Sequence, residues 1–140
     1  MSYSPPNAWK LSGGGSRVTL APPNVVQAGA AMEVKRVGEP VPATEENVKA
    51  YADVAPRYLP KEATKVTVVD SGIASIRLGK YSMVEVNLTY SLFGQLFTTN
   101  ILFMPYEKQQ QVTFQVTARS ADFPAVSKAF RRSLYSLQGF

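Results

Sequence analysis

The fold of this chain is decided by an alternating stretch in its second half, Val84-Glu85-Val86-Asn87-Leu88-Thr89-Tyr90-Ser91-Leu92. Apolar side chains occupy every second position of this stretch, and mostly polar side chains occupy the positions between them. A period of two places successive side chains on opposite faces of a β-strand. The stretch therefore predicts a long strand with one apolar face and one polar face.

Two further stretches, residues 97–103 and 112–118, extend this pattern toward the C-terminus. Three long alternating strands in succession are typical of an antiparallel sheet with one buried face and one polar face. We therefore expect the polar side chains of these strands to share one face of the sheet. They are Asn87, Thr89, Ser91, Thr98, Asn100, Thr113, Gln115 and Thr117.

A helical pattern follows the strands, with apolar residues at intervals of three or four: Phe123, Val126, Phe130, Leu134 and Leu137. This spacing puts them along one side of a helix that can cover the apolar face of the sheet. Ser120 or Asp122 can cap the start of that helix.

The first half of the chain predicts shorter elements. Residues 9–20 form a hairpin around Gly13-Gly14-Gly15, and Trp9 is expected to anchor it on the core. A strand over residues 31–37 and a helix that ends near Pro56 follow. Residues 65–69 and 73–78 predict two further strands. The fold class is thus α+β, an antiparallel sheet of about six to seven strands flanked by helices, in a single domain over residues 1–140 after a lead-in of residues 1–4.

The composition excludes the commonest enzyme chemistries. Cysteine and histidine are both absent. Disulfides, zinc sites of the Cys/His type, cysteine nucleophiles and histidine-activated serines are therefore impossible. Among the acids of the second half, only Glu85 lies within a predicted strand, and we expect it to pair with a cross-strand Lys or Arg. We expect no enzyme activity, no metal and no cofactor.

The net charge is +5, and most of the excess lies in residues 108–140. The basic residues there are Lys108, Arg119, Lys128, Arg131 and Arg132, against the single acid Asp122. Such a basic surface can meet an acidic protein, a nucleic acid or anionic lipid, or it can be a solvated helix face that favours the helix dipole. Because no stacking aromatics are interleaved with the charges, we do not expect nucleic-acid binding.

We expect the chain to bind a protein partner through the polar sheet face or the basic residues near its end. The predicted contact residues are Arg119, Lys128, Arg131, Arg132, Asn87, Thr89, Asn100 and Gln115. The alternative is a small-ligand carrier with an apolar pocket between sheet and helix. Large side chains argue against that space, namely Phe97, Phe103, Phe114 and Phe130.

The sequence contains no run of about 20 apolar residues that could span a membrane, and its start does not resemble a signal peptide. An initiating Met followed at once by domain-like sequence is typical of a chain from which a leader has been removed. On that interpretation the protein is exported, and we expect it to be periplasmic or envelope-associated.

Several short motifs carry a resemblance to a known superfamily. They are Pro6-Asn7-Ala8-Trp9, Val18-Thr19-Leu20-Ala21-Pro22-Pro23, Gly94 before a long strand, and Phe123 with Phe130-Arg131-Arg132-Ser133-Leu134. In these motifs and in the order of its elements, the chain resembles the superfamily that joins the photosystem II extrinsic protein PsbP to the Ran-binding Mog proteins and to uncharacterised bacterial relatives. The resemblance implies an αβα sandwich and a binding or assembly role rather than an enzyme. It transfers no functional residue, and the basic charge of this chain argues against Ran binding.

Overall fold

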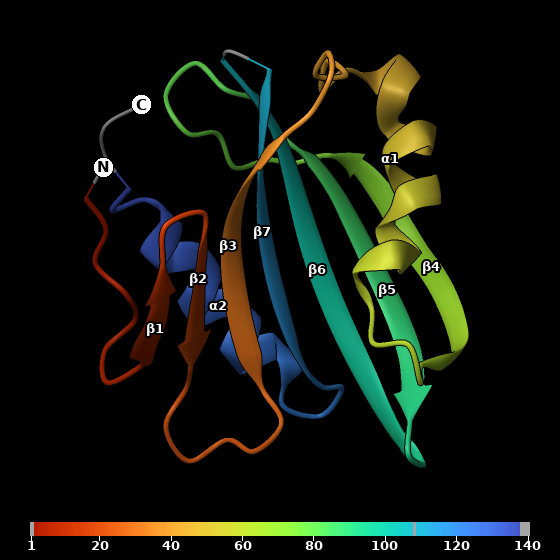
Figure 1. Cartoon of the computed structure of the whole chain (residues 1–140). Helices are drawn as coiled ribbons and strands as arrows, with labels where there is room; N and C mark the ends of the chain where they lie inside the picture. Colours follow the sequence, from red (N-terminus) through yellow and green to blue (C-terminus); the bar gives the residue numbers. More distant parts are fainter. Residues whose placement is uncertain (1, 108, 138–140) are drawn as a thin grey trace.

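The computed structural model describes residues 2–107 and 109–137. Within these residues, seven strands form one antiparallel sheet in the order β1-β2-β3-β7-β6-β5-β4 (Figure 1). The strands are β1 (Lys10–Gly14), β2 (Arg17–Ala21), β3 (Gly29–Arg36), β4 (Thr64–Ile73), β5 (Val84–Leu92), β6 (Gln95–Tyr106) and β7 (Gln110–Arg119). The expected α+β class and strand number are confirmed.

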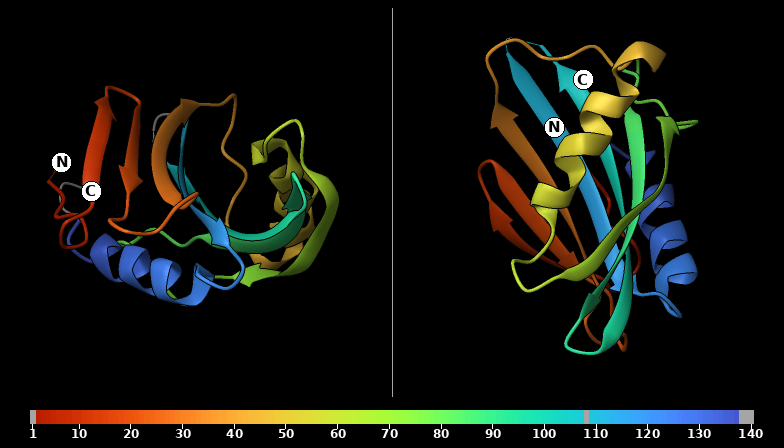
Figure 2. Two further views of the ribbon diagram at one scale, coloured as in Figure 1. Left: turned by 90° about the horizontal axis from the view of Figure 1, so that it is seen from below. Right: turned by 90° about the vertical axis from the view of Figure 1, so that its right-hand side faces the viewer.

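Two helices lie on opposite faces of the sheet (Figure 2). α1 (Val48–Val54) lies between the 3-10 turns η1 (Glu45–Asn47) and η2 (Ala55–Tyr58), and α2 (Phe123–Leu134) follows β7. The first helix ends where Pro56 was expected to end it, because proline lacks the N–H that would continue the bonding. Among the described residues, neither of these helices, nor any other, is long and apolar enough to cross a membrane.

Each helix packs on its own apolar core. Phe130 of α2 packs against Phe114 of β7 on one face of the sheet. Tyr51 of α1 packs against Val86 of β5 and Phe103 of β6 on the other face, with its ring 5.1 Å from the ring of Phe103. The two faces are called the α2 side and the α1 side below.

The apolar side of the sheet changes at β6, so the expectation of one buried face and one polar face was wrong. Val84 of β5 pairs with Phe103 of β6, whereas Leu102 of β6 pairs with Phe114 of β7. Directly opposed residues lie on the same face. The apolar residues of β5 and β7 therefore lie on opposite faces, and β6 is buried on both, with all four residues 101–104 at 0 % exposure.

β4 is one continuous strand, so the expected pair of strands over residues 65–69 and 73–78 was wrong. Its pairing with β5 shifts register twice before Asp70, at β-bulges or similar irregularities, and then continues regularly through Asp70-Ser71-Gly72. After Ile73 the chain leaves the sheet, but Ala74, Ile76 and Leu78 are still buried in the α2-side core. Because every second residue of this segment is buried, its sequence shows the same alternation that predicts a strand.

The segment before β1 packs against the end of α2. The ring of Trp9 lies 6.5 Å from that of Phe130 in a stacked arrangement, so Trp9 anchors the hairpin as predicted. The Tyr3 hydroxyl lies 2.5 Å from that of Ser133, and the Ser4 N–H donates to Ser136 Oγ at 2.9 Å. Residues from the two ends of the chain therefore lie side by side.

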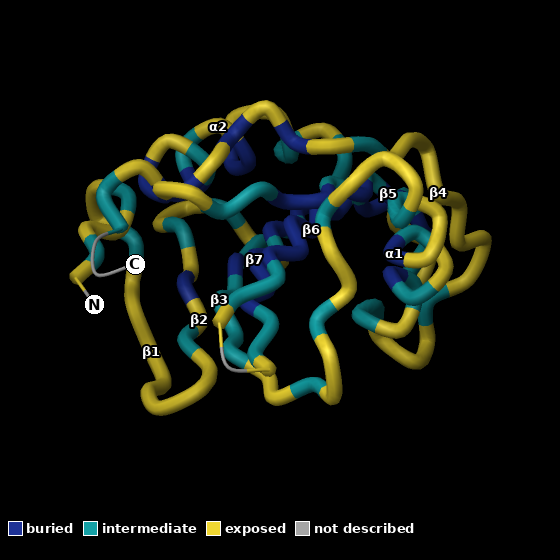
Figure 3. Tube along the Cα trace, turned by 90° about the horizontal axis from the view of Figure 1, so that it is seen from above, coloured by how far each residue is buried: buried dark blue, intermediate teal, exposed yellow. Residues whose placement is uncertain are grey.

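Burial is concentrated in the middle of the sheet, in β5, β6 and β7, while the outer strands β1 and β4 are largely exposed (Figure 3). Each helix covers only part of its face. Parts of both faces therefore remain open to solvent, and the candidate sites lie there.

Candidate functional site

The polar residues that were expected on one face are divided between two. The strand register places Asn87, Thr89, Ser91, Thr98 and Asn100 on the α2 side, and Thr113, Gln115 and Thr117 on the α1 side. This division follows from the change of apolar side at β6. Gln115 is therefore separated by the sheet from the other three strand residues that were predicted to contact a partner.

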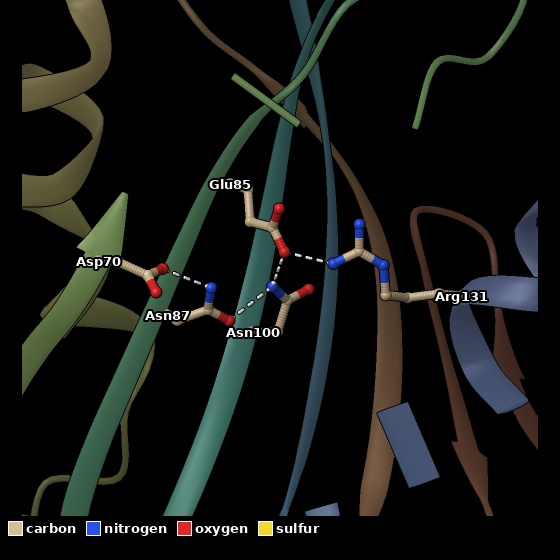
Figure 4. Close-up of polar contacts among 5 residues, drawn as sticks. All are labelled: Asp70, Glu85, Asn87, Asn100 and Arg131. Atoms are coloured by element: carbon tan, nitrogen blue, oxygen red, sulfur yellow. Dashed lines mark hydrogen bonds and ion pairs between the residues drawn. The ribbon is translucent and has the colours of Figure 1, made fainter. Parts of the chain in front are cut away.

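On the α2 side, five side chains form a continuous polar ladder (Figure 4). Asn87 Nδ2 donates to Asp70 Oδ1 at 2.7 Å. Asn100 Nδ2 donates to Asn87 Oδ1 at 2.8 Å and to Glu85 Oε2 at 2.6 Å, and Arg131 of α2 donates to the same Glu85 oxygen. Three predicted contact residues, Asn87, Asn100 and Arg131, thus meet, but their polar groups already bond within the protein. The ladder ties α2 to strands β4, β5 and β6.

The other basic residues of the predicted surface do not form one cluster. Arg119 lies 3.4 Å from the carboxylate of Asp122 at the start of α2. Lys128 and Arg132 are exposed and share the outer face of α2, one turn apart. Lys108 lies outside the described residues. The helix therefore presents a pair of exposed cations, with Arg131 engaged beside them.

The α1 side carries a groove with a volume of about 570 Å³, which is within the usual range for ligand sites. Strands β1, β2, β3 and β7 form its floor. Its wall is formed by residues 58–60, which follow α1, and by Tyr90 of β5. The lining residues used below are Lys10, Ser12, Arg17, Thr19, Ala31, Tyr58, Tyr90, Gln115 and Thr117.

The floor of the groove follows from strand register. Ser12, Thr19, Ala31 and Gln115 are direct neighbours across four adjacent strands. Three strand spacings separate the first from the last, or about 14 Å. All four side chains are small or polar, and the small Ala31 at β3 leaves open space above the floor.

Gln115 is fixed at the foot of the wall. Its Nε2 donates to Thr99 Oγ1 at 3.2 Å and to the carbonyl of Tyr58 at 3.4 Å, and Thr99 is 2.7 Å from the Thr117 hydroxyl. Both hydrogens of the amide are therefore used, and its oxygen is left to accept a hydrogen bond. Of the eight predicted contact residues, Gln115 is the one that lines the groove as the structure describes it.

Tyr90 brings a second polar group to the groove. Its side chain is only 3 % exposed, and its ring stacks 5.4 Å from that of Phe97. Burial raises the pKa of Tyr90 above its usual value, so its hydroxyl remains a protonated donor at neutral pH. Among the residues the structure describes, none accepts a hydrogen bond from it, and because no buried polar side-chain atom among them lacks a partner, the hydroxyl is accessible to solvent.

The charge of the groove is positive. Lys10 and Arg17 line it, and no Asp or Glu is among its described lining residues. Arg17 lies 3.4 Å from Glu33 in an exposed contact, which leaves most of its five N–H donors available. Over the described part of the chain, no group of three acidic side chains is placed to hold a metal ion.

A smaller pocket of about 370 Å³ lies on the α2 side, beyond the end of α2. Its lining is mainly apolar and includes Leu11, Val18, Met32, Val34, Phe114 and Leu137. Phe114 lines this pocket rather than filling it, so there is space on this side of the sheet beyond the end of the helix.

Comparison at the level of sequence finds no match: no protein family matches the chain, and no curated protein is detectably similar to it. Solved structures are similar in fold. LpqN of Mycobacterium tuberculosis, a protein involved in cell envelope biogenesis, superposes with a TM-score of 0.62 at 16 % identity over 97 % of this chain and 80 % of LpqN.

Two other structures give the same result. The cyanobacterial PsbP of Synechocystis matches with a TM-score of 0.62 at 8 % identity, over 99 % of this chain and 85 % of its own. PA94 of Pseudomonas aeruginosa, a protein of unknown function suggested to be a regulator, matches with a TM-score of 0.59 at 16 % identity, over 96 % of this chain and 88 % of its own. The chain therefore has the PsbP-like αβα fold that its sequence motifs led us to expect.

Proposed function

We propose that this chain is a non-enzymatic binding or assembly module that recognises a protein partner through the groove on its α1 side. The observation that carries the proposal is the open floor over β1, β2, β3 and β7, lined by polar groups whose positions are fixed by register and by the bonds of Gln115. Preorganised polar groups around an open hollow favour binding, because little ordering entropy is lost when an occupant arrives.

The structural neighbours give this proposal further support. One is suggested to be a regulator, one takes part in envelope biogenesis and one is a PsbP, and none is described as an enzyme. A role in recognition or assembly is compatible with all three.

Photo-cross-linking in the protein's own cells tests the proposal. Benzoylphenylalanine in place of Ser12, which lines the groove, should give one discrete cross-linked protein. Adding Thr19→Trp, which fills the groove, should abolish that product. Thr67→Trp, at an exposed threonine of the edge strand β4, is the matched control and should leave it intact. A product that persists with Thr19→Trp would contradict the groove as the binding site.

The small-ligand carrier is a second candidate, favoured by the apolar pocket of about 370 Å³ on the α2 side. Native mass spectrometry of the protein isolated from its own cells would then find a fixed mass increment. Met32→Trp, which fills this pocket, should remove the increment while Thr19→Trp leaves it. A bare chain of sequence mass would count against the carrier.

A further inference from the structure

We propose that the groove holds an extended acidic segment of the partner protein, with its carboxylates against Lys10 and Arg17. The inference rests on the proposed function and adds the chemistry of the occupant at the same groove. Three features of the groove carry it: its charge, its unsatisfied hydrogen-bonding groups and its shape.

The charge of the lining selects a negative occupant. Lys10 begins β1 and Arg17 begins β2, and no carboxylate of a described residue lines the groove with them. Lys10 makes no ion pair with any described residue, and the contact of Arg17 with Glu33 is open to solvent, with the two side chains 55 % and 31 % exposed. Separate carboxylates of one segment can therefore pair with the two cations without displacing a buried partner.

The unsatisfied groups match a peptide. The Tyr90 hydroxyl is a solvent-accessible donor of the groove lining with no acceptor among the described residues, and a carboxylate or a peptide carbonyl supplies one. Gln115 Oε1 is an acceptor without a donor in the same part of the chain, and a peptide N–H supplies that. Only a ligand that carries both donors and acceptors satisfies the two groups together.

The shape selects an extended segment. The row from Ser12 to Gln115 runs about 14 Å across the strands, which is the length of about four residues in extended conformation. A single-stranded nucleic acid is also anionic, but it binds largely by stacking its bases on exposed aromatic rings. Tyr90 is only 3 % exposed and its ring is stacked on Phe97, so it offers no exposed ring face of that kind.

Fluorescence anisotropy with defined probes tests the inference on the full chain. The probe is a capped, labelled peptide of about eight residues in which Asp alternates with Thr, and the matched probe carries Asn in place of Asp. We expect the acidic peptide to bind at least about tenfold more tightly than the amide peptide, since each charge-assisted contact contributes roughly the free energy of a tenfold change. Equal binding of the two peptides, or none, would overturn the inference.

Variants then locate the bound peptide. The Lys10→Gln/Arg17→Gln double variant should weaken binding of the acidic peptide by about tenfold or more, and added salt should reduce the remainder. Tyr90→Phe should weaken it several-fold, with thermal stability measured in parallel. Lys128→Gln, at an exposed cation of α2 on the other face, is the matched control and should change nothing. A loss in Lys128→Gln with no loss in the double variant would place the peptide on α2 and refute the inference.

Two further results distinguish a failure of this inference from a failure of the proposed function. If an oligothymidine of similar length binds the groove more tightly than the acidic peptide, the occupant is not a peptide. If Thr19→Trp abolishes the cellular cross-link while the acidic peptide fails to bind, the groove remains the partner site and the acidic occupant is wrong.

Discussion

In the part of the chain that the structure describes, Glu85 and Arg131 form an ion pair that joins the helix α2 to strand β5. The two side chains are 22 % and 25 % exposed, so the pair is partly shielded from water. Glu85 also accepts a hydrogen bond from Asn100, which is 2 % exposed. Removing Arg131 would thus leave a carboxylate facing a buried amide with no cation beside it.

We expect Arg131→Ala to lower the free energy of unfolding by about 1–3 kcal/mol, because hydrogen bonds to charged groups are costly to lose when the partner stays partly buried. Lys128→Ala, three residues earlier on the exposed face, should change it by less than about 0.5 kcal/mol. Urea denaturation measures both. Equal losses in the two variants would show that the polar ladder adds nothing to stability.

The helix α2 is the element whose packing the sequence predicted best. Its spacing of apolar residues placed Val126, Phe130 and Leu134 on one side, and these are 4 %, 1 % and 0 % exposed. Leu137 follows the end of the helix and lines the apolar pocket instead. The period of 3.6 residues follows from the geometry of the helix alone. The buried side of α2 could therefore be predicted without knowing what the helix packs against.

Phe130→Ala should therefore lower the free energy of unfolding by about 3–5 kcal/mol, the usual cost of an aromatic cavity in a core. Tyr135 follows the same helix but is 68 % exposed, and Tyr135→Ala should cost less than about 1 kcal/mol. The midpoint and slope of urea unfolding, compared between the two variants, check the expectation. A loss below about 1 kcal/mol for Phe130→Ala would mean that α2 does not pack as described.

The strands were predicted less completely. Alternation within a strand distinguishes its apolar face from its polar face, but it does not show which of these faces lies on the same side of the sheet as the apolar face of the neighbouring strand. That alignment is set by pairing register, which depends on residues far apart in the sequence. One signal was present. Residues 101–104 are consecutively apolar, and such a run is typical of a strand buried on both faces. It marks β6 as the strand where the apolar side changes.

The candidate site was predicted least. Of the residues that line the groove, only Gln115 was among the expected contacts, whereas Lys10, Arg17 and Tyr58 were missed. A groove is space that the helices leave uncovered, and no local pattern encodes it. The available hint was the alternation of small residues Gly29 and Ala31 in a sheet strand, because their lack of bulk gives the groove its depth.

At the scale of the whole molecule, the two helices divide the sheet diagonally. α2 covers the α2 side over β6 and β7, and α1 covers the α1 side over β4 and β5. Each helix leaves part of its own face uncovered. The uncovered part of the α2 side carries the polar ladder, and the uncovered part of the α1 side carries the groove. A partner seated in the groove would therefore touch strands from the first and last thirds of the chain at once, and β7 would lie between it and α2.

The pairing of β3 with β7 also fixes the order in which the chain can complete its fold during synthesis. Gly29 lies opposite Thr117 and Arg36 opposite Gln110, so the N-terminal hairpin and β3 have no sheet to join until β7 has left the ribosome. Closing so long a loop is slow compared with local pairing. We expect a chain that stops at residue 109 to be readily digested by protease over residues 1–36, while the full chain is resistant, as limited proteolysis would measure. Protection of residues 1–36 in the shortened chain would contradict this. A nascent chain of this protein therefore keeps residues 1–36 open until the residues of β7 have been made, and helpers that act on unfinished chains have that whole interval in which to engage it.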